Sequence, residues 1–328
     1  MTNNAAPIGA RAGAVLTVLA GLALGDGTVA AEPGMVKFRE GTLPRSWDVS
    51  AKCTEVPDFQ VHEYNPDFYI LRQSGCSHDE KPFLYLLFGT DKAFLLDTGA
   101  GPAEPRTAPV DVVGAVDAVI RQWLAVNERA SIPLVVAHLH SHSDHTAGDP
   151  QFAARPDTTL VKADVAAMKP FFGISQWPEE IVPYDLGGRI LDVISIPGHD
   201  VNSIAVFDRQ TGVLLTGDSL YPGRVYVNGD PNVFKASNQR LVDFARDHTV
   251  THILGTHIEQ TRTPFVDYAV GTIYQPDEHV LELGVGHLLE LNDALMAMGD
   301  QFKPQRFADF SVCGHYPTCE AQPVEVTD

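Results

Sequence analysis

A cluster of four histidines and one aspartate directly follows a short apolar segment near the middle of the chain. The cluster reads HLHSHSDH, residues 138–145, and the β-branched segment before it is expected to be a buried strand. Side chains two residues apart at a strand end project to the same side, so His140 and His142 can bind one metal ion together. If the chain turns after them, Asp144 and His145 can face a second ion. The cluster therefore predicts half of a two-metal site.

Three later strand-like segments also end in a glycine close to a possible metal ligand. Segments 190–196, 213–215 and 252–254 run into Pro-Gly-His199, Thr-Gly-Asp218 and Gly-Thr-His257. Because active residues of α/β folds gather at strand ends, we expect His199 to complete the first ion's ligands, His257 to complete the second's, and Asp218 to bridge both. Nitrogen and oxygen ligands without a thiolate suit zinc and tolerate iron or manganese.

Strands and helices are expected to alternate in an α/β fold. Strands are predicted at 68–73, 83–88, 93–97, 132–137, 159–161, 190–196, 203–207, 213–215 and 252–254, and helices at 116–124, 163–171, 238–247 and 286–298. Residues 32–66 show little periodicity and are expected to form an arm or loop, and residues 259–284 a loop that serves as a lid or an interface. Asp97, at a strand end, is expected to bond the backbone amides of its turn.

The N-terminus has the pattern of an export signal. Arg11 precedes an uncharged apolar run, residues 12–25, and small residues suited to cleavage stand before Glu32. The run is shorter than the ~20 apolar residues of a membrane-spanning helix, which is the alternative interpretation. We therefore expect residues 1–31 to be a signal peptide and residues 32–328 to form a single domain with an N-terminal arm and a C-terminal tail. The mature protein would be periplasmic or secreted, without stable membrane insertion.

The charge and the cysteines restrict the partners and the compartment. A net charge of −19, from 42 acidic and 23 basic residues without a basic stripe, disfavours nucleic acid as a partner. The four cysteines allow three pairings, of which we favour the local pairs Cys53–Cys76 and Cys313–Cys319. The alternative is four free thiols in a reducing cytosol. The oligomeric state has no signature in the sequence.

The residues 140–145, HSHSDH, resemble the HxHxDH signature of the metallo-β-lactamase-fold hydrolases, and Asp97, His199, Asp218 and His257 follow in the order of that superfamily. The resemblance extends from about residue 68 to residue 257. It implies a four-layer αββα sandwich with the site along one edge of two sheets. It also implies that one metal ion is bound by His140, His142 and His199, and the other by Asp144, His145 and His257, with Asp218 bridging the two. Asp97 would hold the loop that carries the ligands. His138 has no counterpart among the superfamily's ligands and is expected to be a buried structural histidine.

The resemblance implies a dinuclear, zinc-dependent hydrolase that attacks a carbonyl-type bond of a small molecule with a metal-bound hydroxide. The N-terminal pattern adds the expectation that this hydrolase is exported. Asp144 would orient the nucleophile and help to move its proton. A small ester or lactone is the favoured substrate, since lactonases of the superfamily share the aspartate bridge. Tyr221 and Tyr226, just beyond Asp218, are expected to reach the carbonyl or leaving oxygen of the substrate, as a tyrosine does in those lactonases. Packing in a loop is the alternative role for these two tyrosines. Packing is also the favoured role for Phe171, Phe172 and Trp177.

Other members of the superfamily fit the sequence less well. Enzymes that hydrolyse β-lactams usually have cysteine or serine in place of Asp218, although export would suit them. Glyoxalase-II-like thioesterases keep the aspartate but resemble the chain poorly after His257. The nucleases carry a large inserted domain. An iron-dependent persulfide dioxygenase remains an alternative, with one iron held by His140, His199 and Asp218.

Overall fold

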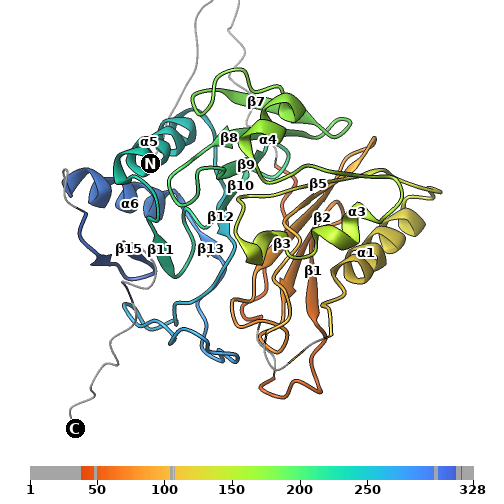
Figure 1. Ribbon diagram of the computed structural model, residues 1–328, viewed down its shortest axis with the longest axis horizontal. Helices are drawn as coiled ribbons and strands as arrows, with labels where there is room; N and C mark the ends of the chain where they lie inside the picture. Colours follow the sequence, from red (N-terminus) through yellow and green to blue (C-terminus); the bar gives the residue numbers. More distant parts are fainter. Residues whose placement is uncertain are drawn as a thin grey trace, which may run out of the picture. The chain divides into compact units, whose positions relative to one another are not determined.

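Two six-stranded sheets pack against each other in the computed structural model, and helices cover their outer faces (Figure 1). The structure describes residues 38–47, 50–103, 106, 108–298, 302–314 and 319, which belong to one unit, Phe38–Asp328. The order of the layers is helix, sheet, sheet, helix, so the predicted four-layer αββα sandwich is confirmed. The predicted signal peptide, residues 1–31, lies outside the described residues.

The first sheet has the order β1-β2-β3-β4-β5-β6. Its strands are β1 (Phe59–Asn65), β2 (Phe68–Gln73), β3 (Phe83–Phe88), β4 (Ala93–Leu96), β5 (Leu134–Ala137) and β6 (Thr158–Leu160). Neighbouring strands are antiparallel up to β4 and parallel from β4 to β6. The expectation of an arm or loop over residues 32–66 is wrong for β1. This edge strand alternates buried and exposed residues and carries His62 and Glu63, so it lacks the apolar run of a central strand.

The second sheet has the order β13-β12-β10-β9-β8-β7. Its strands are β7 (Ile181–Asp185), β8 (Ile190–Ser195), β9 (Ile204–Asp208), β10 (Val213–Gly217), β12 (His252–Gly255) and β13 (Glu282–Leu283). The predicted hairpin of β9 and β10 is confirmed, and β10 pairs with β12 in parallel. The edge strands β7 and β13 were not predicted. A third, small sheet joins β11 (Arg224–Tyr226), β15 (Ser311–Cys313) and β14 (Gln305–Arg306).

Helices lie on both outer faces (Figure 1). They are α1 (Val112–Val126), α2 (Ser143–Thr146), α3 (Asp149–Ala153), α4 (Val165–Phe172), α5 (Pro231–Asp247) and α6 (Val285–Ala297). Helix α5 begins earlier than expected, where the Asp230 side chain accepts a hydrogen bond from the Asn232 amide and Pro231 takes the first position. No helix among the described residues is apolar over a length that would cross a membrane.

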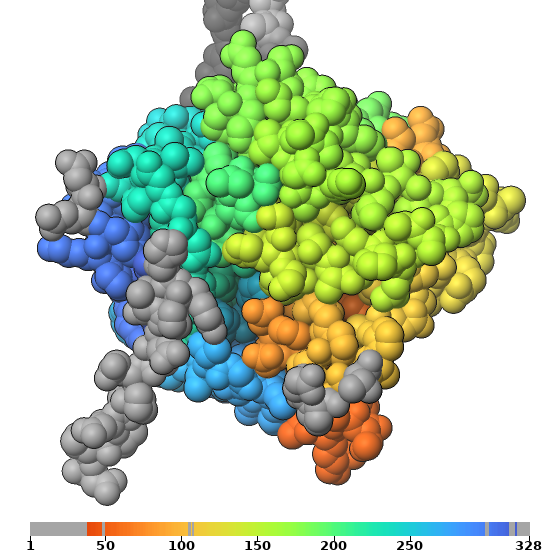
Figure 2. All heavy atoms as spheres, viewed as in Figure 1, coloured from red at the N-terminus to blue at the C-terminus, as the bar shows by residue number. Residues whose placement is uncertain are grey.

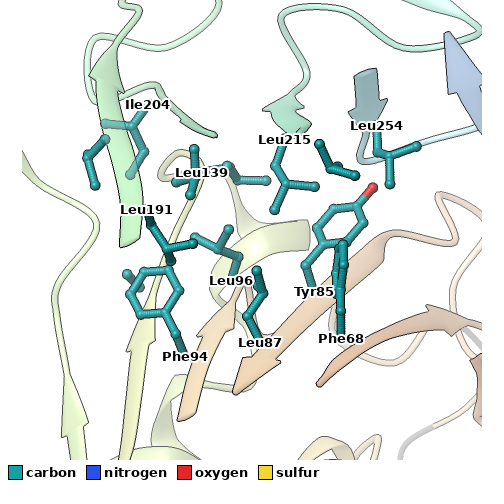
Figure 3. Close-up of a cluster of buried hydrophobic side chains, with 14 of the residues drawn as sticks. Phe68, Tyr85, Leu87, Phe94, Leu96, Leu139, Leu191, Ile204, Leu215 and Leu254 are labelled. Carbon is teal, nitrogen blue, oxygen red and sulfur yellow. The ribbon is translucent and has the colours of Figure 1, made fainter. Parts of the chain in front are cut away.

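Apolar side chains from the facing strands fill the space between the two sheets (Figure 3). Leu87 and Leu96 of the first sheet point toward Leu191 and Leu215 of the second, and all four are fully buried. At one edge the sheets are also joined by polar bonds. The Tyr85 hydroxyl donates to the carbonyl of Gly255, and the Phe83 amide donates to the carbonyl of Thr256 at 2.8 Å. These bonds fix the end of β12 against the first sheet.

Both expected disulfides are present, Cys53–Cys76 and Cys313–Cys319. The first joins the loop before β1 to the turn between β2 and β3, and the second joins Cys313, the last residue of β15, to Cys319. Phe171, Phe172 and Trp177 pack in or against the core between the sheets, as expected.

Candidate metal centre

Three histidines from two strand ends bring their ring nitrogens together. His140 follows β5, His142 stands at the N-terminus of the one-turn helix α2, and His199 follows β8. His142 Nδ1 lies 2.9 Å from His140 Nε2 and 3.1 Å from His199 Nε2. The three candidate ligand atoms lie within 4.8 Å of one another. The structure thus assembles the predicted ligands of the first ion.

A second group of four ligands lies beside the first. Asp144, His145, Asp218 and His257 each offer one atom within 4.8 Å of the others. Asp144 Oδ2 is 3.1 Å from His145 Nε2 and 3.2 Å from His257 Nε2. The carboxylate of Asp218 faces both groups, with Oδ1 3.4 Å from His145 Nε2 and Oδ2 3.6 Å from His199 Nε2. Asp218 therefore has the geometry of a bridging ligand.

Glycines let the chain leave two of these strands beside the ligands. Gly217 has φ +57° and precedes Asp218, and Gly198 has φ +145° and precedes His199. A Cβ on Gly198 would lie 2.6 Å from the Phe234 Cα, so no larger residue fits there. Glycine is therefore favoured at both positions because the backbone has a positive φ, and at Gly198 also because Phe234 leaves no room for a side chain.

Hydrogen bonds on the far side of three histidine rings fix their orientation. His145 Nδ1 donates to Asp97 Oδ2, His199 Nδ1 to the carbonyl of Tyr226 and His257 Nδ1 to the carbonyl of Glu80, each at 2.8 Å. These bonds leave Nε2 of each ring unprotonated and turned toward the site when the imidazole is neutral. Asp97 also accepts the Leu139 amide at 2.8 Å, so it bonds the turn as expected and orients His145 as well.

The donor set fits divalent metal ions. His145 Nε2 and Asp218 Oδ1 are buried and have no hydrogen-bond partner within the part of the chain that the structure describes. Burying such polar atoms without a partner costs about 1–3 kcal/mol each, and a bound cation would satisfy both. With three imidazoles in one group, two imidazoles and two carboxylates in the other, and no thiolate, the set suits zinc and also accommodates iron or manganese.

The protein groups alone give the two sets opposite protonation tendencies. Burial lowers the pKa of His140 and His199 below the usual range. Burial also acts on His145 and His257, but neighbouring carboxylates, Asp97 and Asp144 for the first and Asp218 and Asp144 for the second, raise the pKa of both well above it. Protons therefore compete with metal ions more strongly at the carboxylate-containing set.

A cavity of about 550 Å³ opens onto both ligand sets. Tyr221 and Tyr226 line it, but the Tyr221 hydroxyl donates to the Arg224 carbonyl and lies 3.3 Å from Glu259 Oε2. Their contact with a substrate stays a prediction. The predicted loop 259–284 supplies one wall of the cavity, including Ala269 to Thr272.

His138 is placed outside both ligand sets. Its Nδ1 is 3.1 Å from the His145 carbonyl and its Nε2 is 3.3 Å from Asp149 Oδ1. It supports the helix that carries the ligands, as a buried structural histidine does.

Sequence reasoning missed Asp200 and Glu80. Asp200 Oδ2 accepts the Ser141 amide at 3.2 Å and the Ser141 hydroxyl, and it lies 3.9 Å from His142 Nε2. It ties the loop of His142 to the loop of His199, and its position directly after a ligand was the available signal. Burial and the nearby Asp144 raise the pKa of Glu80 to about 7, although half of its side chain is exposed.

Replacing Asp97 with asparagine should weaken metal binding by roughly 10–100-fold, the usual effect of removing a carboxylate that orients a ligand histidine. The affinity is measured by titration against a chromophoric chelator, with circular dichroism as the test of folding. Asp192→Asn is the matched control, because Asp192 is also buried and bonds Arg209 away from the site. Equal affinities in the two variants would contradict the role of Asp97.

Metal affinity should rise as the pH increases above the ordinary pKa of histidine. The raised pKa values mean that His145 and His257 hold protons above the ordinary histidine value of 6.5, and a metal ion must displace them. Affinity is thus lost as the pH falls through these pKa values. Calorimetric titrations at pH 7.0, 7.5 and 8.0 in buffers of different ionisation enthalpy would count the released protons. A flat affinity over this range would show that both imidazoles are already neutral.

Comparison with known proteins identifies the family. The family model described as the metallo-beta-lactamase superfamily matches residues 81–253. A hydroxyacylglutathione hydrolase of Aeromonas hydrophila subsp. hydrophila is 28% identical over 190 residues, which cover 57% of this chain and 68% of that protein. The acyl-coenzyme A thioesterase MBLAC2 of Bos taurus is 27% identical over 168 residues, which cover 43% of this chain and 58% of that protein.

Among solved structures, a metallo-beta-lactamase from Pontibacter korlensis superposes with a TM-score of 0.45 at 15% identity, covering 73% of this chain and 99% of that one. FIM-1 from Pseudomonas aeruginosa gives 0.46 at 15% identity, covering 75% and 97%. Because the family model covers more than half of the 328 residues, the chain belongs to the metallo-β-lactamase superfamily of metal-dependent hydrolases.

Proposed function

We propose that this protein is a dinuclear metal-dependent hydrolase that cleaves a carbonyl-type bond in a small-molecule ester or lactone, with thioesters in the same class of bond. The observation that carries the proposal is the pair of ligand sets that converge on Asp218 in one cavity. The names of the curated relatives support carbonyl chemistry, because hydroxyacylglutathione hydrolase and acyl-coenzyme A thioesterase both denote thioester hydrolysis.

Seven side chains would hold the metal ions. His140, His142 and His199 form the first set, Asp144, His145 and His257 the second, and Asp218 faces both. Two bound divalent ions, with zinc favoured, would lower the pKa of a shared water toward neutrality and polarise the carbonyl oxygen of the substrate.

Asp144 is the residue best placed to handle the proton of the attacking water. It lines the cavity, and its Oδ2 lies 3.1 Å from His145 Nε2. Burial alone would raise its pKa, but His145 and His257 hold the pKa well below the usual range, so the carboxylate stays ionised. An ionised carboxylate at this position accepts a hydrogen bond from the water, orients it toward the carbonyl carbon, and passes a proton to the leaving group.

We further propose that the protein works in the periplasm or outside the cell. The sequence pattern of residues 1–31 supports export. Two disulfides and no free cysteine among the described residues fit an oxidising compartment.

The zinc-loaded protein should hydrolyse at least one carbonyl substrate in a panel of lactones, aryl esters, thioesters, β-lactams and phosphoesters. Asp144→Asn should lower kcat by about 100-fold or more, in the range expected for loss of a general base, while His140, His142 and His199 still bind metal. The exposed Asp243→Asn, on the outer helix α5, is the control. Turnover of phosphoesters alone, or an Asp144→Asn variant with most of its activity, would overturn the proposal.

A second candidate function follows from a subset of the same ligands. Asp218 Oδ2 lies 3.6 Å from His199 Nε2 and 3.8 Å from His140 Nε2, and two histidines with one carboxylate can hold a single iron of an oxygen-using enzyme. This arrangement would suit a persulfide dioxygenase.

Metal analysis separates the two candidates. Protein purified without added metal should contain about two zinc ions per chain if all seven ligands are used. One iron per chain, with oxygen uptake in the presence of a persulfide, would favour the dioxygenase and contradict the hydrolase.

A further inference from the structure

The cavity carries acidic side chains beyond those that face the metal site. Asp79, Glu80 and Glu259 line it in addition to Asp144 and Asp218. Asp79 and Glu80 precede β3, and the Glu80 carbonyl accepts the bond from His257 Nδ1 at 2.8 Å. Asp79 and Glu80 therefore line the cavity directly beside the candidate metal ligands.

Arg224 is the one lysine or arginine among the described residues that line the cavity, and its charge is already compensated. Its side chain is 2% exposed. One terminal nitrogen donates to Glu259 at 2.8 Å, and the other donates to the Tyr268 carbonyl at 2.8 Å and lies 3.8 Å from Asp267. The guanidinium thus stabilises the wall of the cavity and has both terminal nitrogens engaged by the chain.

One wall of the cavity, next to Tyr268, has small side chains and an apolar surface. It consists of Ala269, Val270, Gly271 and Thr272, and Val270 is 46% exposed. The buried Lys81 fixes this wall, since its Nζ donates to the Thr272 carbonyl at 3.0 Å. In Figure 2 the blue segment that contains the wall lies next to the orange segments of the first sheet. A Cβ on Gly271 would lie 3.9 Å from Asp79 Oδ2, so an acid stands directly beside the apolar surface.

A ligand in this cavity therefore meets an apolar wall and a rim of negative charge. Apolar groups gain from contact with Val270, whereas an anionic group would approach Asp79 and Glu80. Among the described side chains that line the cavity, no lysine or arginine besides the paired Arg224 could receive it. The net charge of −19 extends the same repulsion to longer range.

We propose that the cavity selects substrates whose groups next to the scissile carbonyl are uncharged or cationic, and that Asp79 and Glu80 exclude anionic carriers such as coenzyme A and glutathione. The inference rests on the proposed hydrolytic function and narrows its substrate class. It separates this chain from the relatives whose names specify those two carriers.

Matched substrate pairs test the selection. One pair carries the same acyl group on coenzyme A and on N-acetylcysteamine, its uncharged terminal fragment, and the other is 4-acetoxybenzoate and phenyl acetate. The metal-loaded protein is assayed at pH 8.5 and low salt, and each rate is corrected for the reactivity of the substrate with hydroxide. In each pair that is hydrolysed, kcat/KM should be at least about 10-fold higher for the uncharged member. The ratio should shrink as sodium chloride is raised, because salt screens the repulsion.

The double substitution Asp79→Asn with Glu80→Gln should narrow the ratio several-fold by accelerating the anionic substrate. Asp243→Asn with Asp247→Asn removes the same charge from exposed positions on α5 and should leave the ratio unchanged. Equal kcat/KM within the pairs, or a ratio that Asp79→Asn with Glu80→Gln does not change, would overturn the selection while hydrolysis stands. Failure to hydrolyse any substrate of either pair or any other carbonyl compound would overturn the proposed function and the inference with it.

Discussion

A buried carboxylate at the end of β4 holds the ligand region together. Asp97 is fully buried, has φ +69°, and bonds the Leu139 amide and His145 Nδ1. An isolated carboxylate in such a place would be strongly destabilising, so the fold depends on its two partners being present. Those partners belong to the turn after β5 and to the helix α2. One side chain thus couples the parallel strands of the first sheet to the position of a metal ligand.

The second constraint is the junction between the two sheets. The candidate ligands of the first sheet follow one strand and are His140, His142, Asp144 and His145, whereas the other three candidates follow strands of the second sheet. The bonds from Tyr85 to Gly255 and from Phe83 to Thr256 lock these edges together just before His257. Because the apolar contact between sheets is non-directional, such polar bonds are needed to bring ligands from both sheets into one constellation.

Most of the fold, and the grouping of the seven candidate ligands, could be predicted from the sequence, because strand ends with histidine or aspartate beside glycine leave a local pattern. The edge strands β1 and β7 could not, since they face solvent on one side and mix polar with apolar residues. The backbone carbonyls of Tyr226 and Glu80, which orient His199 and His257, could not be predicted either. Every residue has a carbonyl, and only the fold determines which one bonds a histidine. The cavity wall, likewise, depends on a long-range bond from Lys81.

The wall around Val270 differs from the metal ligands in how it is built. The ligands stand on the ends of several separate strands, and changing one strand would disturb both the core and the metal centre. The wall belongs to one loop, between β12 and β13, and two cationic side chains, Lys81 and Arg224, hold it by its main-chain carbonyls. Because both bonds use main-chain carbonyls, a substitution at Val270 would change the surface of the wall and leave these two bonds in place. The surface that a ligand meets can thus be altered by substitution without disturbing the strands that carry the candidate metal ligands.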